Sequence, residues 1–179
     1  MKLMFISDVH GSYKWAKLAI DKYHEEKPDK LIILGDILYH GPRNDLPEDY
    51  NPKKVIALLN PLKKDIIAVR GNCDAEVDQM VLEFMITSDY CTMDVDNHHF
   101  FITHGHLFNK DKMPFLNKGD IFVHGHFHKP MIENQDGIII INPSSISLPK
   151  EGTNSYGIYE NDTFIIKDFQ NNTINSINF

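Results

Sequence analysis

Aspartate, asparagine and histidine side chains recur directly after short apolar segments of this chain. Five such segments lie at residues 3–6, 31–34, 66–69, 100–103 and 121–123. If they are strands of one sheet system, their polar followers meet at a common edge, because ligands of open α/β sheets gather at the carboxyl ends of strands. The polar residues that follow them are Asp8, His10, Asp36, Asn72, His104, His126 and His128.

A mixed set of oxygen and nitrogen donors is typical of sites for Mn²⁺, Fe²⁺ or Zn²⁺. So many ligands exceed the needs of one tetrahedral ion, whereas two ions that share a bridging carboxylate could use all of them. Two metals about 3.5–4 Å apart support phosphoryl chemistry, because together they activate a water and stabilise charge on phosphate oxygens. The residues therefore predict a dinuclear metal site suited to the chemistry of phosphate esters.

The composition is that of an acidic globular protein. The 179 residues include 25 Asp and Glu against 18 Lys and Arg, which gives a formal net charge of −7. Seven of the ten histidines lie between residues 98 and 128, where an even spread would place roughly two. The acidic charge argues against a nucleic-acid polymer as partner, since proteins that bind one usually present a basic face.

The apolar runs are too short to cross a membrane, because the longest span about four residues and a spanning helix needs about 20. The first apolar stretch ends at Ser7-Asp8, too early for the core of a signal peptide. Two cysteines, Cys73 and Cys91, make no disulfide framework. We therefore expect a cytoplasmic protein without membrane contact, and a homo-oligomer remains possible.

The order of the predicted elements indicates an α/β fold. Ser12 is a good N-cap for a helix at about 13–26, and Asn51-Pro52 can begin a second helix that ends near residue 59. These helices alternate with the first three apolar segments, and such a βαβαβ pattern predicts parallel strands with right-handed crossovers.

The second half of the chain is rich in predicted strands. Another strand is expected at 138–141, and residues 156–159 and 164–169 read as a terminal hairpin. A long loop at 39–50 is a candidate functional segment, since long loops in compact domains are often functional. We find no linker or repeat, so residues 1–179 are expected to form a single domain.

The polar residues fall into five ordered blocks, and these resemble the motifs of the calcineurin-like metallophosphoesterase superfamily. The family pattern is D-x-H, G-D, G-N-[HC]-[DE], an isolated H, and G-H-x-H. The matching blocks are Asp8-Val9-His10, Gly35-Asp36, Gly71-Asn72-Cys73-Asp74, His104 and Gly125-His126-Phe127-His128. Within that superfamily, essentially the whole chain is similar to the YfcE-type phosphodiesterases.

The resemblance implies a four-layer α-β-β-α sandwich, in which helices flank two mixed sheets. It also implies two divalent metal ions bridged by Asp36 and a hydroxide, with Mn the expected metal and Fe, Zn, Ni and Co also compatible. One ion would be held by Asp8, His10 and His128. The other would be held by Asn72, His104 and His126.

The activity implied by the resemblance is hydrolysis of a small phosphodiester, by in-line attack of the metal-bridging hydroxide on phosphorus. Two alternatives stay open. One is a non-catalytic scaffold on the same fold, as in the Vps29 subunits of retromer, although the full set of seven ligands argues against it. The other is a phosphomonoesterase or nuclease at the same metal site.

Three further residues, His106, Arg43 and His40, are candidates for contact with the substrate. Arg43 could bind phosphate oxygens with two parallel hydrogen bonds, or it could pair with an acidic residue of its own loop. His106 could assist the metal ligands or donate to a substrate oxygen, or it could be an ordinary loop residue. Arg70 and Asp74 could pair with each other and brace the third motif.

Cys73 stands where many superfamily members carry a histidine that protonates the leaving group. A thiol with a pKa near 8.5 is a poorer proton donor than an imidazolium. We expect Cys73 to pack beside the site rather than to act as a nucleophile. We also expect diesters with good leaving groups to be hydrolysed faster than alkyl monoesters.

Overall fold

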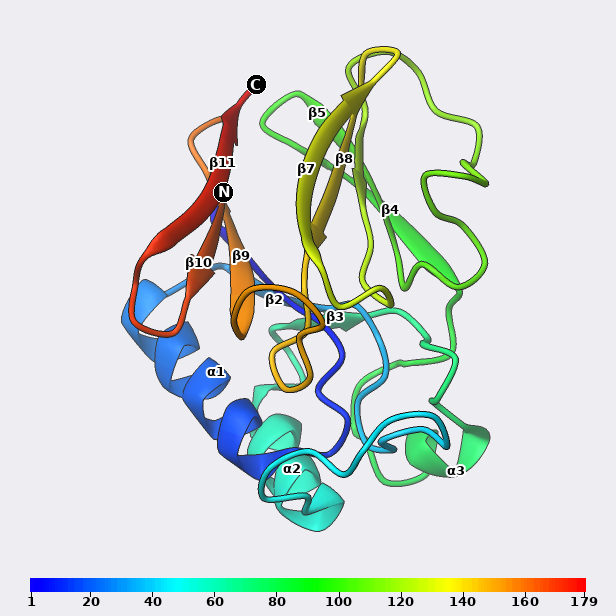
Figure 1. Cartoon of the computed structure of the whole chain (residues 1–179), viewed down its shortest axis with the longest axis vertical. Coiled ribbons are helices and arrows are strands. Elements are labelled where there is room, and N and C mark those ends of the chain that lie inside the picture. Colours follow the sequence, from blue (N-terminus) through cyan, green and yellow to red (C-terminus); the bar gives the residue numbers. More distant parts are fainter.

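The computed structural model describes all residues from 1 to 179, and its main feature is a pair of β-sheets packed face to face (Figure 1). The first sheet runs β11-β10-β9-β1-β2-β3, and the second runs β4-β5-β6-β8-β7. The strands of the first sheet are β1 Leu3–Ile6, β2 Lys30–Ile33, β3 Ile66–Ala68, β9 Ser155–Glu160, β10 Thr163–Asp168 and β11 Thr173–Asn178. Those of the second are β4 Tyr90–Val95, β5 His98–Thr103, β6 Ile121–Val123, β7 Pro130–Gln135 and β8 Ile138–Pro143.

Both sheets are mixed, and each has a parallel centre. In the first sheet β1, β2 and β3 are parallel, while β9, β10 and β11 add antiparallel strands. In the second sheet β5, β6 and β8 are parallel, with β4 and β7 antiparallel at its edges. The polar residues predicted to do chemistry follow the carboxyl ends of β1, β2, β3, β5 and β6.

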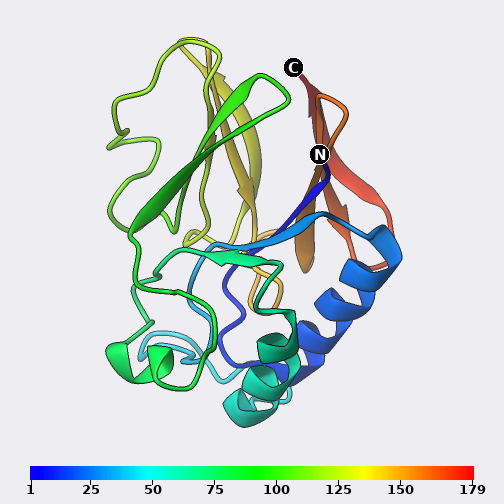
Figure 2. The same ribbon diagram turned by 180° about the vertical axis from the view of Figure 1, so that it is seen from behind.

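Two helices cover the outer face of the first sheet (Figures 1 and 2). Helix α1 spans Tyr13–Glu26 with Ser12 as its N-cap, and helix α2 spans Pro52–Leu59 with Asn51 as its N-cap. A one-turn 3₁₀ segment, Asn60–Leu62, follows α2, and a single turn, α3, covers Glu76–Gln79. Both predicted helices are therefore confirmed, with their caps.

The core has three parts that correspond to the layers. One lies between the helices and the first sheet, and includes Ala19, Ile33 and Val55. A second, which includes Phe5 and Phe100, fills the space between the sheets. The third, on the outer face of the second sheet, is covered by residues 108–116 of an irregular segment. The predicted α/β sandwich of two mixed sheets is confirmed, and the flanking helices α1 and α2 both lie on the side of the first sheet.

Three strands absent from the sequence-based expectation, β4, β7 and β11, all lie at sheet edges. Strand β11 is almost wholly exposed, and its sequence TINSIN has no alternating apolar pattern. The exposed half of β7 reads Glu133-Asn134-Gln135. Strand β11 and this half of β7 are held by backbone pairing and bury little apolar surface, so hydrophobic periodicity does not reveal them.

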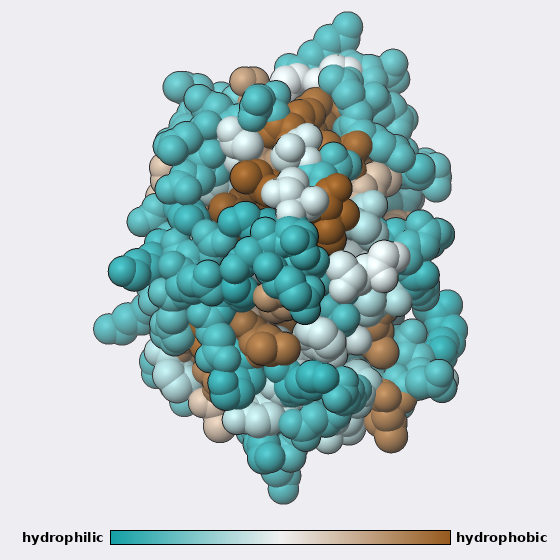
Figure 3. All heavy atoms as spheres, turned by 60° about the vertical axis from the view of Figure 1, so that its left-hand side comes forward, coloured by the Kyte–Doolittle hydropathy of each residue, from teal (hydrophilic) through white to brown (hydrophobic).

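The side of the molecule that carries α1 and β11 is mostly hydrophilic, with small separate hydrophobic patches (Figure 3). Helix α1 is the longest helix, and neither it nor any other helix has the length and apolar character needed to cross a membrane.

Candidate metal centre

Most of the predicted metal ligands have a backbone conformation that side chains seldom adopt. A positive φ is uncommon outside glycine, and such strain persists where the surrounding structure enforces it, often at functional sites. Here it turns the side chains that follow β1, β2 and β6 back toward one another. The residues and their φ values are Asp8 (54°), His10 (49°), Asp36 (55°), His126 (68°) and His128 (57°).

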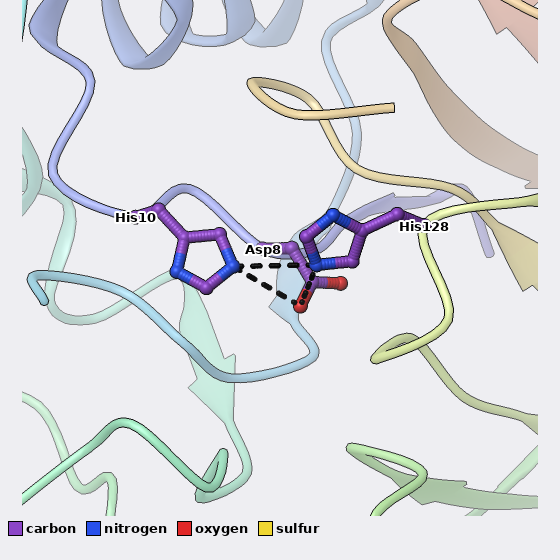
Figure 4. A group of neighbouring side chains, drawn as sticks. All are labelled: Asp8, His10 and His128. Atoms are coloured by element: carbon purple, nitrogen blue, oxygen red, sulfur yellow. Dashed lines mark hydrogen bonds and ion pairs between the residues drawn. The ribbon is translucent and has the colours of Figure 1, made fainter. Parts of the chain in front are cut away.

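The first group of side chains comprises Asp8, His10 and His128. The rings of His10 and His128 approach each other beside the Asp8 carboxylate (Figure 4), with 3.3 Å between their Nε2 atoms. Asp8 Oδ1 lies 3.1 Å from His128 Nε2 and 3.7 Å from His10 Nε2. All three residues are buried. Two imidazoles and a carboxylate therefore converge on one point inside the protein.

The second group lies beside the first and is built around Asp36 and His104. His104 Nε2 is 3.5 Å from Asp36 Oδ2, 3.1 Å from Asn72 Oδ1 and 3.2 Å from His126 Nδ1. Asp36 Oδ2 also lies 3.8 Å from His10 Nε2 of the first group. The carboxylate of Asp36 thus stands between the two groups, and the structure brings all seven predicted ligands together.

Hydrogen bonds determine which ring nitrogen of three histidines faces the centre. His10 Nδ1 lies 2.9 Å from Tyr39 O, His104 Nδ1 2.6 Å from Leu34 O, and His128 Nδ1 2.6 Å from Leu148 O. A carbonyl only accepts, so each Nδ1 carries the hydrogen and each Nε2 is left to face the cluster. Backbone carbonyls orient metal-binding histidines in the same way.

No Lys or Arg side chain pairs with the carboxylates of the cluster. Asp8 Oδ1 is buried and accepts no hydrogen bond, although His128 Nε2 is near it. Lone pairs on Nε2 atoms that face one another and face carboxylate oxygens repel unless a cation lies among them. The donor set therefore fits divalent metal ions, which bind neutral imidazole, carboxylate and amide oxygen.

The pKa shifts of His104 and Asp8 arise from the close packing of carboxylates and imidazoles in the cluster. Burial alone would lower the pKa of His104, but the hydrogen bond and charge of Asp36 and the charge of Asp8 outweigh it and raise the pKa to about 9. Burial likewise opposes ionisation of Asp8, yet the neighbouring histidines hold its pKa far below its usual range. The carboxylates of Asp8 and Asp36 stabilise a positive charge at the centre. That charge can be a proton on His104 or a metal ion.

Asp74 braces the second group from behind. Its Oδ2 accepts hydrogen bonds from the backbone N–H of Asp36 and of Gly71, and its Oδ1 accepts one from Ile37, each at 2.8 Å. The predicted pair of Arg70 with Asp74 is wrong. Arg70 binds Asp89 at 2.7 Å instead, because Asp74 is fully used by the backbone of two neighbouring loops.

Serines hold the first group in place, and sequence reasoning missed them. Ser145 Oγ and Ser147 Oγ both donate to the carbonyl oxygen of Asp8 at 2.8 Å. Ser7 Oγ and the backbone N–H of His126 donate to Asp8 Oδ2, which leaves Oδ1 to face the centre. Small hydroxyl residues are common in turns, so only the folded structure reveals this role.

Two glycines permit the close approach of the loops. A Cβ on Gly71 would lie 2.0 Å from Asp36 Oδ1, and one on Gly125 would lie 1.8 Å from Ser7 Oγ. Any side chain there would displace a candidate ligand or its partner. The glycines of the G-N and G-H blocks are thus required by packing around the centre.

A cavity of about 420 Å³ opens over the centre. Arg43 lines it and forms no ion pair with the acidic residues of its loop. Phe127 and Lys150 also line it, and neither was predicted. The other lining residues are Asp36, Gly41, Pro42, Asn44, Asn72, Cys73, His126 and His128.

His40 and His106 do not line this cavity. The His40 ring packs against Tyr39 and Tyr50, and its Nδ1 is buried without a partner. His106 is half-buried with ring centroid 5.3 Å from that of His104, and burial together with the charge of His104 lowers its pKa. His106 therefore lies beside the metal ligands, while His40 is held away from the cavity.

Cys73 lines the cavity with a half-buried thiol that accepts a hydrogen bond from Asn72 Nδ2 at 3.2 Å. Burial and the negative charge of Asp36 raise the pKa of this thiol far above its usual range. The thiol therefore stays protonated at neutral pH, which argues against a nucleophilic role.

Comparisons with known proteins agree with this geometry. Residues 1–163 match the family model of the calcineurin-like phosphoesterase superfamily domain. The chain is 46% identical to phosphodiesterase YfcE of Escherichia coli, over 93% of this chain and 91% of the relative. A solved structure of the E. coli phosphoesterase Yfce superposes with a TM-score of 0.97, at 43% identity and 99% coverage of both chains.

The fold is shared more widely. A Vps29 structure from Entamoeba histolytica superposes with a TM-score of 0.64 at 17% identity, and covers 100% of this chain and 99% of its own. At that level of identity the likeness concerns the fold alone.

Replacing Asp74 by Asn should lower the free energy of unfolding by about 2 kcal/mol. An amide cannot accept all three backbone hydrogen bonds, and its NH₂ group, itself a donor, would face a backbone N–H. Asp89→Asn is the matched control, since its exposed pair with Arg70 contributes at most about 1 kcal/mol. Urea denaturation measures both. Equal, small effects of the two substitutions would show that Asp74 does not brace the loops.

Mn²⁺ should stabilise the protein against heat. At a Mn²⁺ concentration about 100 times Kd, binding raises the free energy of unfolding by roughly 2.7 kcal/mol. For a chain of this length, that corresponds to a rise in Tm of roughly 5–10 °C. His128→Ala should lose most of this rise, whereas His99→Ala, whose ring pairs with Asp94 away from the centre, should keep it. Calorimetry with and without EDTA measures the shift, and an undiminished shift in His128→Ala would refute the assignment.

Proposed function

The chain belongs to the calcineurin-like phosphoesterase superfamily, and we propose that it hydrolyses small phosphodiesters with two divalent ions, preferably Mn²⁺. The observation that carries the proposal is the convergence of His Nε2 atoms and buried carboxylate oxygens on one centre. The relatives named phosphodiesterase support the type of ester, and residues 1–179 act as one domain in this proposal.

We assign Asp8, His10 and His128 to one ion, and Asn72, His104 and His126 to the other. The position of Asp36 supports a bridging role, because its Oδ2 lies 3.8 Å from His10 Nε2 and 3.5 Å from His104 Nε2. Its Oδ1 is occupied by the backbone N–H of Cys73 at 2.8 Å, which fixes the carboxylate plane. Two ions held so close would together supply an activated water and would polarise the phosphate oxygens.

The remaining residues of the cavity bind and orient the substrate in this proposal. Arg43 offers a planar set of donors to the phosphate oxygens that do not bear ester groups. Phe127, the exposed aromatic residue between His126 and His128, offers a flat apolar surface to an aromatic ester group. Neither group needs to transfer a proton.

Neither Cys73 in the cavity nor His106 beside the metal ligands is a strong proton donor to the leaving group. The Cys73 thiol has a raised pKa, which makes it a weak acid. Burial and the charge of His104 lower the pKa of His106, which favours its neutral form over the imidazolium. Esters whose alcohol leaves without protonation, such as aryl diesters, should therefore react faster than alkyl monoesters.

A small substrate suits the charge distribution. The net charge is −7, whereas two divalent ions would add four positive charges at the centre. The cavity can therefore attract a phosphodiester while the rest of the surface repels a long polyanion. We therefore do not propose a nucleic-acid polymer as the substrate. We also do not propose a scaffold role, because a scaffold does not need a complete set of metal ligands. Formation of a homo-oligomer is compatible with the proposed function.

The proposal predicts Mn²⁺-dependent hydrolysis of bis(4-nitrophenyl) phosphate. Asp36→Asn and His104→Ala should each reduce kcat/KM by roughly 100-fold or more, because several kcal/mol of transition-state stabilisation depend on the metals. Asp45→Asn, at an exposed residue of the 39–50 loop, and His99→Ala are the matched controls and should keep the activity.

Circular dichroism should show that both inactive variants remain folded. Near wild-type activity in either would overturn the ligand assignment. Bound metal without turnover of any diester in the wild type would instead favour the scaffold, and faster hydrolysis of 4-nitrophenyl phosphate would favour a monoesterase.

A further inference from the structure

Two cationic side chains at the rim of the main cavity lack acidic partners. Arg43 and Lys150 both line this cavity, and no carboxylate lies within 4.0 Å of either. The cations nearby are different: Arg70 pairs with Asp89, and Lys129 pairs with Glu151. The positive charges of Arg43 and Lys150 are therefore available to a ligand.

The position of Lys150 is tied to the metal centre by consecutive hydrogen bonds. Its backbone N–H donates to His128 O at 2.8 Å, and the His128 ring donates to Leu148 O at 2.6 Å. Leu148 N–H in turn donates to Ser145 Oγ, which donates to the carbonyl of Asp8. The segment that carries Lys150 is thus attached to two candidate ligands of one metal ion.

With two divalent ions bound, the positive charge in and around the cavity would be larger than is needed to balance the single negative charge of a simple phosphodiester. Two divalent ions, the carboxylates of Asp8 and Asp36, and one hydroxide sum to a single positive charge, which already balances a phosphodiester monoanion. Arg43 adds one positive charge to the lining of the cavity. Lys150 adds one more, and the volume of about 420 Å³ is within the usual range for sites that hold a whole small molecule.

We propose that Lys150 is a specificity-determining residue that binds a second anionic group of the substrate, a phosphate or a carboxylate carried by an ester group beyond the scissile phosphate. This inference rests on the proposed phosphodiesterase function. It narrows the substrate class to small phosphodiesters with an additional negative charge, and it assigns Lys150 no part in bond cleavage.

The kinetic test compares two 4-nitrophenyl diesters with the same leaving group, one with a propyl and one with a 2-carboxyethyl second ester group. Wild type should prefer the anionic diester. Lys150→Met should reduce kcat/KM for it by about fivefold relative to the propyl diester, the loss expected for one partly exposed charge pair. Lys150→Arg should retain most of the preference.

The matched control is Lys129→Met. Lys129 adjoins His128 in the sequence but pairs with Glu151 and does not line the cavity, so its loss should leave the preference unchanged. An unchanged preference in Lys150→Met, or an equal loss of preference in Lys129→Met, would overturn the proposal. Turnover of the propyl diester reports the proposed function separately from the role of Lys150.

A binding measurement decides the question even without turnover. Calorimetry on Mn²⁺-loaded protein compares propylphosphonate with 3-phosphonopropionate and with propylene-1,3-diphosphonate. Lys150→Met should weaken the two ligands with a second anionic group by about fivefold and leave propylphosphonate unchanged, and the larger loss identifies carboxylate or phosphate as the better fit. Equal affinities of wild type and Lys150→Met for all three would show that Lys150 is an ordinary solvated side chain.

Discussion

The structure depends on one electrostatic constraint, the packing of carboxylate oxygens and histidine Nε2 atoms into a buried cluster that contains no Lys or Arg side chain. Asp8 Oδ1 is buried without a hydrogen bond, and the Nε2 atoms of His10 and His128 are 3.3 Å apart. Such an arrangement is unfavourable unless positive charge lies within it. The raised pKa of His104 is the response of the protein itself to that demand.

Much of the surrounding fold serves to hold this unfavourable cluster together. The positive φ of Asp8 and Asp36 turns their side chains inward where β1 and β2 end. Asp74 joins the backbones of two loops, and Ser145 and Ser147 hold the carbonyl of Asp8. These bonds come from segments far apart in the sequence, so the strain is balanced by the whole sandwich. The same bonds set Lys150 beside the cavity.

The convergence of these seven side chains could be predicted from the sequence, because each follows an apolar strand and parallel strands bring their carboxyl ends together. The two long helices and their caps, Ser12 and Asn51, are predictable for similar local reasons. The partner of Arg70 cannot be predicted in this way, because the choice of Asp89 over Asp74 depends on which backbone groups surround each carboxylate. The exposure of Phe127 and Lys150 to the cavity depends on loop conformation, which no periodic pattern encodes.

The most direct test of the account is anomalous X-ray scattering from crystals soaked with Mn²⁺. Two peaks of similar height are predicted on either side of Asp36, one among Asp8, His10 and His128 and the other among Asn72, His104 and His126. A single peak, or a second peak away from Asn72 and His104, would contradict the assignment of a shared dinuclear centre, and crystals without a peak in the cluster would contradict the central claim that it binds metal.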